Sequence, residues 1–60
     1  MTKQQELDYI IDKLNTLSSD LIYLGAIMKK HYKDTIFEQH GEEMLNAGLM
    51  AKRWRDEILN

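Results

Sequence analysis

The sequence predicts an all-α fold: an antiparallel helical hairpin that dimerises into a four-helix bundle. Two segments of helical length each carry core-type residues at alternating spacings of three and four. The first series is Leu7, Ile10, Leu14, Leu17, Leu21, Leu24 and Met28. The second series is Phe37, His40, Met44, Ala47, Ala51, Trp54 and Ile58. Such spacing returns a residue to the same stripe of a helix every half-heptad, which is typical of the seam of a bundle.

The first helix is predicted over about 3–32. Thr2 followed by Gln5 forms a capping box, in which the hydroxyl accepts from an early amide and the glutamine side chain reaches back. Residues 16–20 include poor helix formers. The apolar series nevertheless stays in phase across them, so we expect one continuous helix.

The turn is predicted at 33–35 and the second helix at about 36–59. Thr35 and Glu38 match a second capping box. Gly48 weakens the middle of this helix, because glycine costs about 1 kcal/mol relative to alanine in a helix interior. Since the connection is short, the two helices should be antiparallel neighbours.

Counting outward from the turn gives the register of the hairpin. It places Leu24 level with Met44 and Leu14 level with Trp54. We therefore expect the two series to pack against each other inside the hairpin, with Trp54 close to Leu14 and Leu17.

A further group of apolar residues lies outside both series but at one level of the hairpin. Two helices bury one stripe each, so this group should form a second interface, either with another copy or with a different protein. The predicted interface residues are Ile22, Tyr23, Ala26, Leu45 and Leu49.

Length and composition also favour self-association. We predict a single domain over residues 1–60. A chain of this size buries only about 60% of its unfolded surface, and this one has no cysteine for a disulfide. A content of 43% hydrophobic and 30% charged residues is that of a folded chain. A homodimer is the remaining common way to stabilise it.

The residue types that support catalysis or metal binding do not fall into a recognisable pattern. Di-metal bundles use a glutamate three residues before a histidine. Met28 precedes His31 at that spacing and Phe37 precedes His40, so neither helix has the motif. We therefore expect no metal site, no cofactor, no catalytic residue and no enzymatic activity.

Charge and hydropathy patterns narrow the partners and the location. The net charge is −2, with acidic residues near the start of each helix and basic residues near its end, as the helix dipole favours. The uncharged run Leu21–Met28 is eight residues long, whereas a membrane-spanning helix needs about 20. We expect a soluble, cytoplasmic protein that does not associate with membranes.

In layout, the chain resembles the plasmid Rop (repressor of primer) proteins, short helical hairpins that dimerise into four-helix bundles and bind paired RNA loops. Both begin Met1-Thr2-Lys3-Gln4. The resemblance implies a bundle architecture and raises RNA as an alternative partner. The acidic residues of the first helix differ from what Rop-like RNA binding uses, because they repel phosphate.

The sequence therefore favours a small, non-catalytic regulator or adaptor that binds another protein as a homodimeric bundle. An inhibitor from a bacterium or mobile element fits this description. Two alternatives remain open: a Rop-like RNA-binding bundle, and a structural subunit or co-chaperone of a larger assembly.

Overall fold

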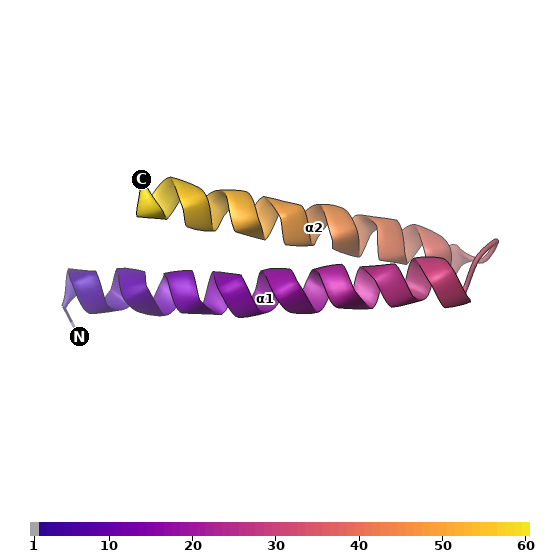
Figure 1. The fold of residues 1–60 in the computed structure, drawn as a ribbon, viewed down its shortest axis with the longest axis horizontal. Coiled ribbons are helices and arrows are strands. Elements are labelled where there is room, and N and C mark those ends of the chain that lie inside the picture. Colours follow the sequence, from indigo (N-terminus) through magenta and orange to yellow (C-terminus); the bar gives the residue numbers. More distant parts are fainter. Residues whose placement is uncertain (1) are drawn as a thin grey trace.

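The computed structural model describes residues 2–60 as an all-helical hairpin of two packed helices (Figure 1). Helix α1 spans Lys3–His31, and helix α2 spans Ile36–Leu59. The first helix ends one residue earlier than predicted, and the second has the predicted bounds. The hairpin is elongated, with principal extents of 47 × 18 × 12 Å. Met1, the first residue of the predicted domain and of the opening shared with Rop, lies outside the described residues.

The start of α1 is capped as the sequence predicts. The Thr2 hydroxyl accepts a hydrogen bond from the Gln5 amide at 3.1 Å, and the Gln5 side-chain oxygen accepts from the Thr2 amide at 2.8 Å. The capping box is therefore confirmed. It satisfies two amides that have no partner within the helix, and so it fixes where α1 begins.

The predicted capping box of α2 is only half correct. The Thr35 hydroxyl accepts from the Phe37 amide at 3.2 Å, but the Glu38 carboxylate accepts from the Asp34 amide at 2.6 Å instead of reaching Thr35. The reason lies in the turn, where Asp34 has a left-handed φ of 65°. The Thr35 amide already donates to the carbonyl of Tyr32, so Glu38 bonds the preceding amide.

The two helices touch along a row of small residues, which we call the contact line. Its members are Ser18, Gly25, Gly41, Gly48 and Ala51, and all are buried. A Cβ atom added to Gly25 would lie 2.6 Å from the carbonyl oxygen of Gly41. One added to Gly41 would lie 2.8 Å from the carbonyl oxygen of Gly25. The helices therefore meet backbone to backbone at this level.

The contacts across the hairpin agree with the predicted register. Gly25 lies against Gly41 and Leu45, and Gly48 lies against Ser18 and Ile22. These pairs bracket the level at which Leu24 was expected opposite Met44. Counting from a short turn was enough to obtain the register, because each helix rises by the same amount per residue.

The predicted rotation of the helices about their own axes is only partly correct, because several members of the two apolar series turn away from the contact between α1 and α2. Ala51 of the second series is buried on the contact line, and Leu14, Leu21, Met28, Met44 and Ile58 are half-buried beside it. Leu17 and Leu24 are each 48% exposed, and Trp54 is 44% exposed. Small residues occupy the contact line because large ones do not fit between backbones this close, so the large side chains are displaced to the flanks.

The hairpin consequently has almost no apolar core of its own. Within residues 2–60, Ala51 is the one hydrophobic residue that is buried. Neither α1 nor α2 contains a stretch that is long and apolar enough to cross a membrane, over the same part of the chain.

We expect Gly25→Ala to destabilise the protein. The substitution adds about 1 kcal/mol of helix propensity, yet its methyl group would meet the Gly41 carbonyl at a distance that forces the helices apart. Thermal denaturation followed by circular dichroism should show a lower melting temperature. As a control, Ala26→Gly at the exposed neighbouring position should cost about 1 kcal/mol from propensity alone. A rise in melting temperature for Gly25→Ala would refute the backbone contact.

Candidate interaction surfaces

The two apolar series form one continuous surface, which we call the apolar face. At about 100° per residue, Leu17 and Leu24 lie on one side of the line through Ser18 and Gly25. Apart from Ala51, which belongs to both, the series on α2 is displaced from its own contact line in the same rotational sense. Because the helices are antiparallel, equal rotations bring the two series to the same side of the hairpin.

The apolar face is free of charge and substantially exposed. None of its fourteen residues, the two series of the sequence analysis, is Asp, Glu, Lys or Arg. Leu7 and Ile10 are 41% and 42% exposed at the open end of the hairpin, and Phe37 is 49% exposed at the turn. Contiguous apolar surface of this kind marks an interaction site.

The size of the apolar face matches that of a protein interface. The first and last members of each series are 21 positions apart, or about 32 Å of helix. Two adjacent helices, each about 10 Å wide, present a flat area of roughly 600 Å² over this length, without counting the relief of the side chains. A standard interface buries about 800 Å² per partner.

Total accessible surface gives an independent estimate. The hairpin exposes 4750 Å². A compact monomer of 7.1 kDa is expected to expose about 4,100 Å². The excess is of the same order as one side of a standard interface.

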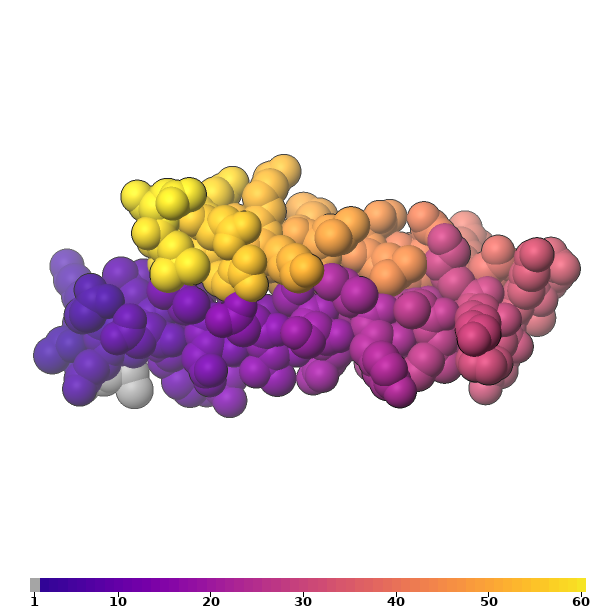
Figure 2. All heavy atoms as spheres, viewed as in Figure 1, coloured from indigo at the N-terminus to yellow at the C-terminus, as the bar shows by residue number. Residues whose placement is uncertain are grey.

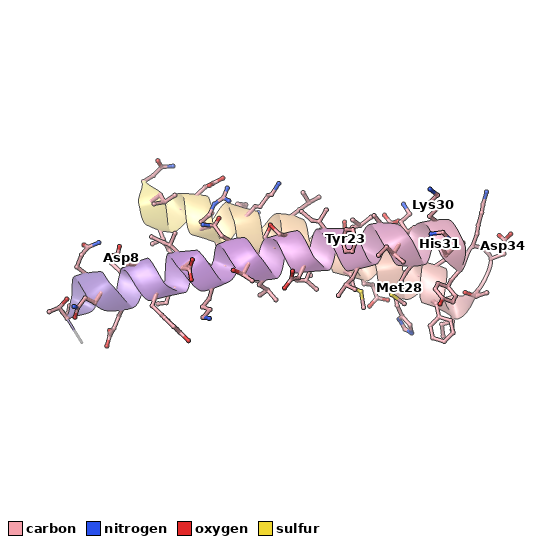
Figure 3. All side chains as sticks on the ribbon, turned by 60° about the horizontal axis from the view of Figure 1, so that its bottom comes forward. Asp8, Tyr23, Met28, Lys30, His31 and Asp34 are labelled. Carbon is pink, nitrogen blue, oxygen red and sulfur yellow. The ribbon has the colours of Figure 1, made fainter. Side chains whose placement is uncertain are left out.

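The turn end of the apolar face is aromatic. Tyr32 and Phe37 lie edge to face with ring centroids 5.8 Å apart, and His40 lies 6.2 Å from Phe37. Met28, Tyr32 and Phe37 line an open apolar hollow. In Figure 3, Met28 lies on the opposite edge of the turn end from Lys30. The hollow therefore lies away from Lys30.

The interface predicted from the sequence is divided by the structure. Ile22 and Leu45 are half-buried, because their side chains pack against Gly48 and Gly25 in the hairpin itself. Tyr23, Ala26 and Leu49 are exposed, with Tyr23 and Leu49 at 68% and 58%. Tyr23 lies in the half of α1 nearer the turn (Figure 3). We call these five residues the outer patch.

By helix rotation, the outer patch lies on the side of the contact line away from the apolar face. Two polar pairs cross between the helices on the same side. The Lys29 ammonium lies 2.7 Å from the Glu42 carboxylate, and the Arg55 guanidinium donates to the Asn15 side-chain oxygen at 2.6 Å. The hydrogen bond and charge of Glu42 raise the pKa of Lys29. The two sides of the hairpin thus differ in chemistry, since the cross-helix polar pairs found among residues 2–60 border the outer patch.

The histidines do not converge on a candidate metal site. His40 lies edge-on to Phe37, and its Nδ1 is 3.9 Å from the Glu43 carboxylate. Both His31 and His40 are exposed. Residues 2–60 contain no group of three or more potential ligands that could hold a metal ion.

Ser18 is a feature that sequence reasoning missed. It is 1% exposed on the contact line, and its hydroxyl finds no hydrogen-bond partner in the described part of the chain. The available signal was the seven-residue spacing shared by Ser18–Gly25 and Gly41–Gly48, which marks a stripe of small residues beside each apolar series. Comparison with protein-family models, curated proteins and solved structures finds no match to this chain.

We expect Ser18→Ala to stabilise the protein by about 1 kcal/mol, because it removes a buried hydroxyl without a partner and leaves the close contact intact. The neighbouring Ser19 is exposed and serves as the matched control. Ser19→Ala should change the free energy of unfolding by less than about 0.5 kcal/mol. Chemical denaturation measures both variants. A destabilised Ser18→Ala would mean that the hydroxyl has a partner in solution.

Proposed function

We propose that the chain is a non-catalytic interaction module: two copies join through their apolar faces into a four-helix bundle, which binds another protein through the outer patch. The observation that carries the proposal is the charge-free apolar face on a hairpin with a single buried hydrophobic residue among residues 2–60. A small regulator or adaptor protein fits these properties.

A second copy is the occupant that best suits the apolar face. Two-fold symmetry pairs a surface with itself, so a face that carries no charge meets no like-charge repulsion across the axis. Its two parallel stripes supply two helices of a four-helix core, and the copy supplies the other two in the same geometry. Because the two series have the same length, both helices would contribute apolar residues to the four-helix core wherever they lie side by side.

The outer patch remains accessible in such a dimer because it lies on the other side of each hairpin. It presents an exposed tyrosine together with Ala26 and Leu49, above the half-buried Ile22 and Leu45. Tyrosine is enriched in protein interfaces because it combines a large apolar ring with a polar end. Two-fold symmetry would give the dimer two such patches.

We expect Leu24→Glu to abolish dimerisation at micromolar concentration, because it places an unpaired charge within the four-helix core. Leu49→Glu provides the matched control, since Leu49 is similarly exposed in the single hairpin but lies in the outer patch. Sedimentation equilibrium should give the dimer mass for the parent chain and for Leu49→Glu. A folded 7.1 kDa monomer in the parent protein would contradict the proposal.

Partner binding is tested by a photo-reactive phenylalanine analogue at Tyr23, expressed in native host cells. We expect irradiation to give a discrete adduct with one protein, and Leu49→Glu in the same chain to reduce its yield at least about tenfold by disrupting the patch. The same analogue at Asp12 of α1 supplies a control outside the patch. Adducts with RNA, or adducts that survive Leu49→Glu, would refute protein binding at the outer patch.

A further inference from the structure

We propose that acid dissociates the paired hairpins through His40, because covering the apolar face requires the imidazole of His40 to be uncharged. The inference rests on the proposed dimer and adds a condition under which that dimer forms. It depends only on which face of the hairpin becomes buried.

His40 is the one titratable member of the apolar face. The other thirteen members are Leu, Ile, Met, Phe, Ala and Trp. Histidine is the side chain that ordinarily changes its charge between pH 5 and pH 8. A face that is otherwise free of charge therefore gains one positive charge per hairpin when this imidazole is protonated.

The surroundings of His40 would change when a second copy covers the face. In the single hairpin the side chain is 48% exposed, so water can solvate the charged imidazole. The ring lies edge to face against Phe37, with ring centroids 6.2 Å apart. The apolar face of a second copy would replace the water with side chains that include no carboxylate. Burial of a charge without such a partner is costly, so pairing favours the uncharged imidazole.

Glu43 is too exposed to offset that cost. Its carboxylate lies 3.9 Å from Nδ1 of His40, which is the one ion pair that His40 makes within residues 2–60. The Glu43 side chain is 70% exposed. Exposed ion pairs contribute little to stability, whereas the desolvation of a charge remains costly even when a partner is present.

The charged groups of α1 near this level lie elsewhere. Counting from the turn places Met28 level with His40. The neighbouring Lys29 pairs with Glu42 on the outer-patch side. Lys30 lies on the opposite edge of the turn end from Met28 (Figure 3). None of these three groups offers a negative charge to the covered imidazole.

The turn end also holds its carboxylates away from the apolar face. Asp34 lies at the tip of the turn, and Glu38 accepts from its amide at 2.6 Å (Figure 3). Lys33 and His31 are exposed, and the phenol of a tyrosine such as Tyr32 is ordinarily uncharged below pH 8. The first turns of α2 lie at the end of the hairpin away from both termini (Figures 1 and 2). Charges at the open end are therefore beyond the screening length of about 8 Å.

Linkage gives the direction of the effect. The single hairpin holds the proton on His40 more readily than the dimer does, so acid favours the single hairpin. An ordinary histidine is about nine-tenths protonated at pH 5.5, and each of the two copies must lose its proton to pair. The dissociation constant of the dimer should therefore rise about 100-fold between pH 7.5 and pH 5.5.

Sedimentation equilibrium at the two pH values and one ionic strength provides the test. The chain has two histidines, so His31→Gln is the matched control for His40→Gln. We expect the rise of about 100-fold in the parent chain and in His31→Gln, but less than about threefold in His40→Gln, because carboxylates ordinarily stay ionised over this interval. His40→Phe, which keeps an aromatic ring, should behave like His40→Gln.

Each outcome separates this inference from the proposed dimer. A dissociation constant that is the same at both pH values in the parent chain would overturn the role of His40 and leave the dimer standing. A pH dependence that His31→Gln removes and His40→Gln retains would do the same. A monomer mass for the parent chain at pH 7.5 would overturn both proposals.

Proton NMR titration gives a second readout that follows each imidazole separately. Leu17→Glu supplies the single hairpin, because it places a charge on the apolar face eleven residues, or about 16 Å, along α1 from the level of His40. The His40 resonance should titrate at lower pH in the parent dimer than in Leu17→Glu, whereas the His31 resonance should titrate alike in both. Identical titration of His40 in the two proteins, with the parent chain dimeric, would overturn the inference.

Discussion

The backbone contact between Gly25 and Gly41 sets the geometry of the rest of the molecule. Where two helices approach until a carbonyl oxygen occupies the space of a missing Cβ, no large side chain fits between them. Leucines and methionines that would otherwise fill the hairpin are displaced to its flanks. The close contact therefore determines both the absence of an internal core and the presence of a broad apolar face. Polar pairs such as Lys29–Glu42 can span the helices on the opposite side for the same reason, since the backbones are near enough for short bridges.

Sequence reasoning recovered the helices, the capping box of α1 and the register because these depend on local chemistry and chain length. The capping box joins Thr2 and Gln5, which are three residues apart in the sequence. Because the turn is short, counting outward from it fixes which residues of the two helices lie at the same level, such as Leu24 and Met44. The rotation of each helix was not recoverable in the same way. A spacing of three and four identifies residues that share a stripe, but it does not say whether that stripe meets the neighbouring helix or another molecule. The small residues at seven-residue intervals, Ser18–Gly25 and Gly41–Gly48, carried the missing information.

The candidate interfaces illustrate the same distinction. Ile22 and Leu45 were grouped with Tyr23 because all three lie outside the apolar series and at one level. The structure places Ile22 and Leu45 against glycines of the opposite helix, and it leaves Tyr23 68% exposed. The residue types and their positions along the hairpin predict that one cross-section of the hairpin is apolar. Only the rotation of the helices decides which of its members face inward. The predicted Glu38 cap was wrong for a comparable reason. The left-handed backbone of Asp34 places the Asp34 amide where Glu38 accepts from it, and the sequence pattern does not reveal this conformation.

The near absence of a buried core links the amount of this protein in a cell to its persistence. A single hairpin with Ala51 as its one buried hydrophobic residue, among residues 2–60, has little to oppose the conformational entropy of the chain. If folding is completed by pairing, the folded population grows with the square of the free-chain concentration, as mass action requires for a dimer. In that case, chains present at low copy number would remain unpaired and open to proteolysis, whereas chains made in a burst would protect one another. The rate of synthesis would then decide whether the chain concentration is high enough for pairing. Dilution by cell growth alone would lower that concentration and so reduce the folded population.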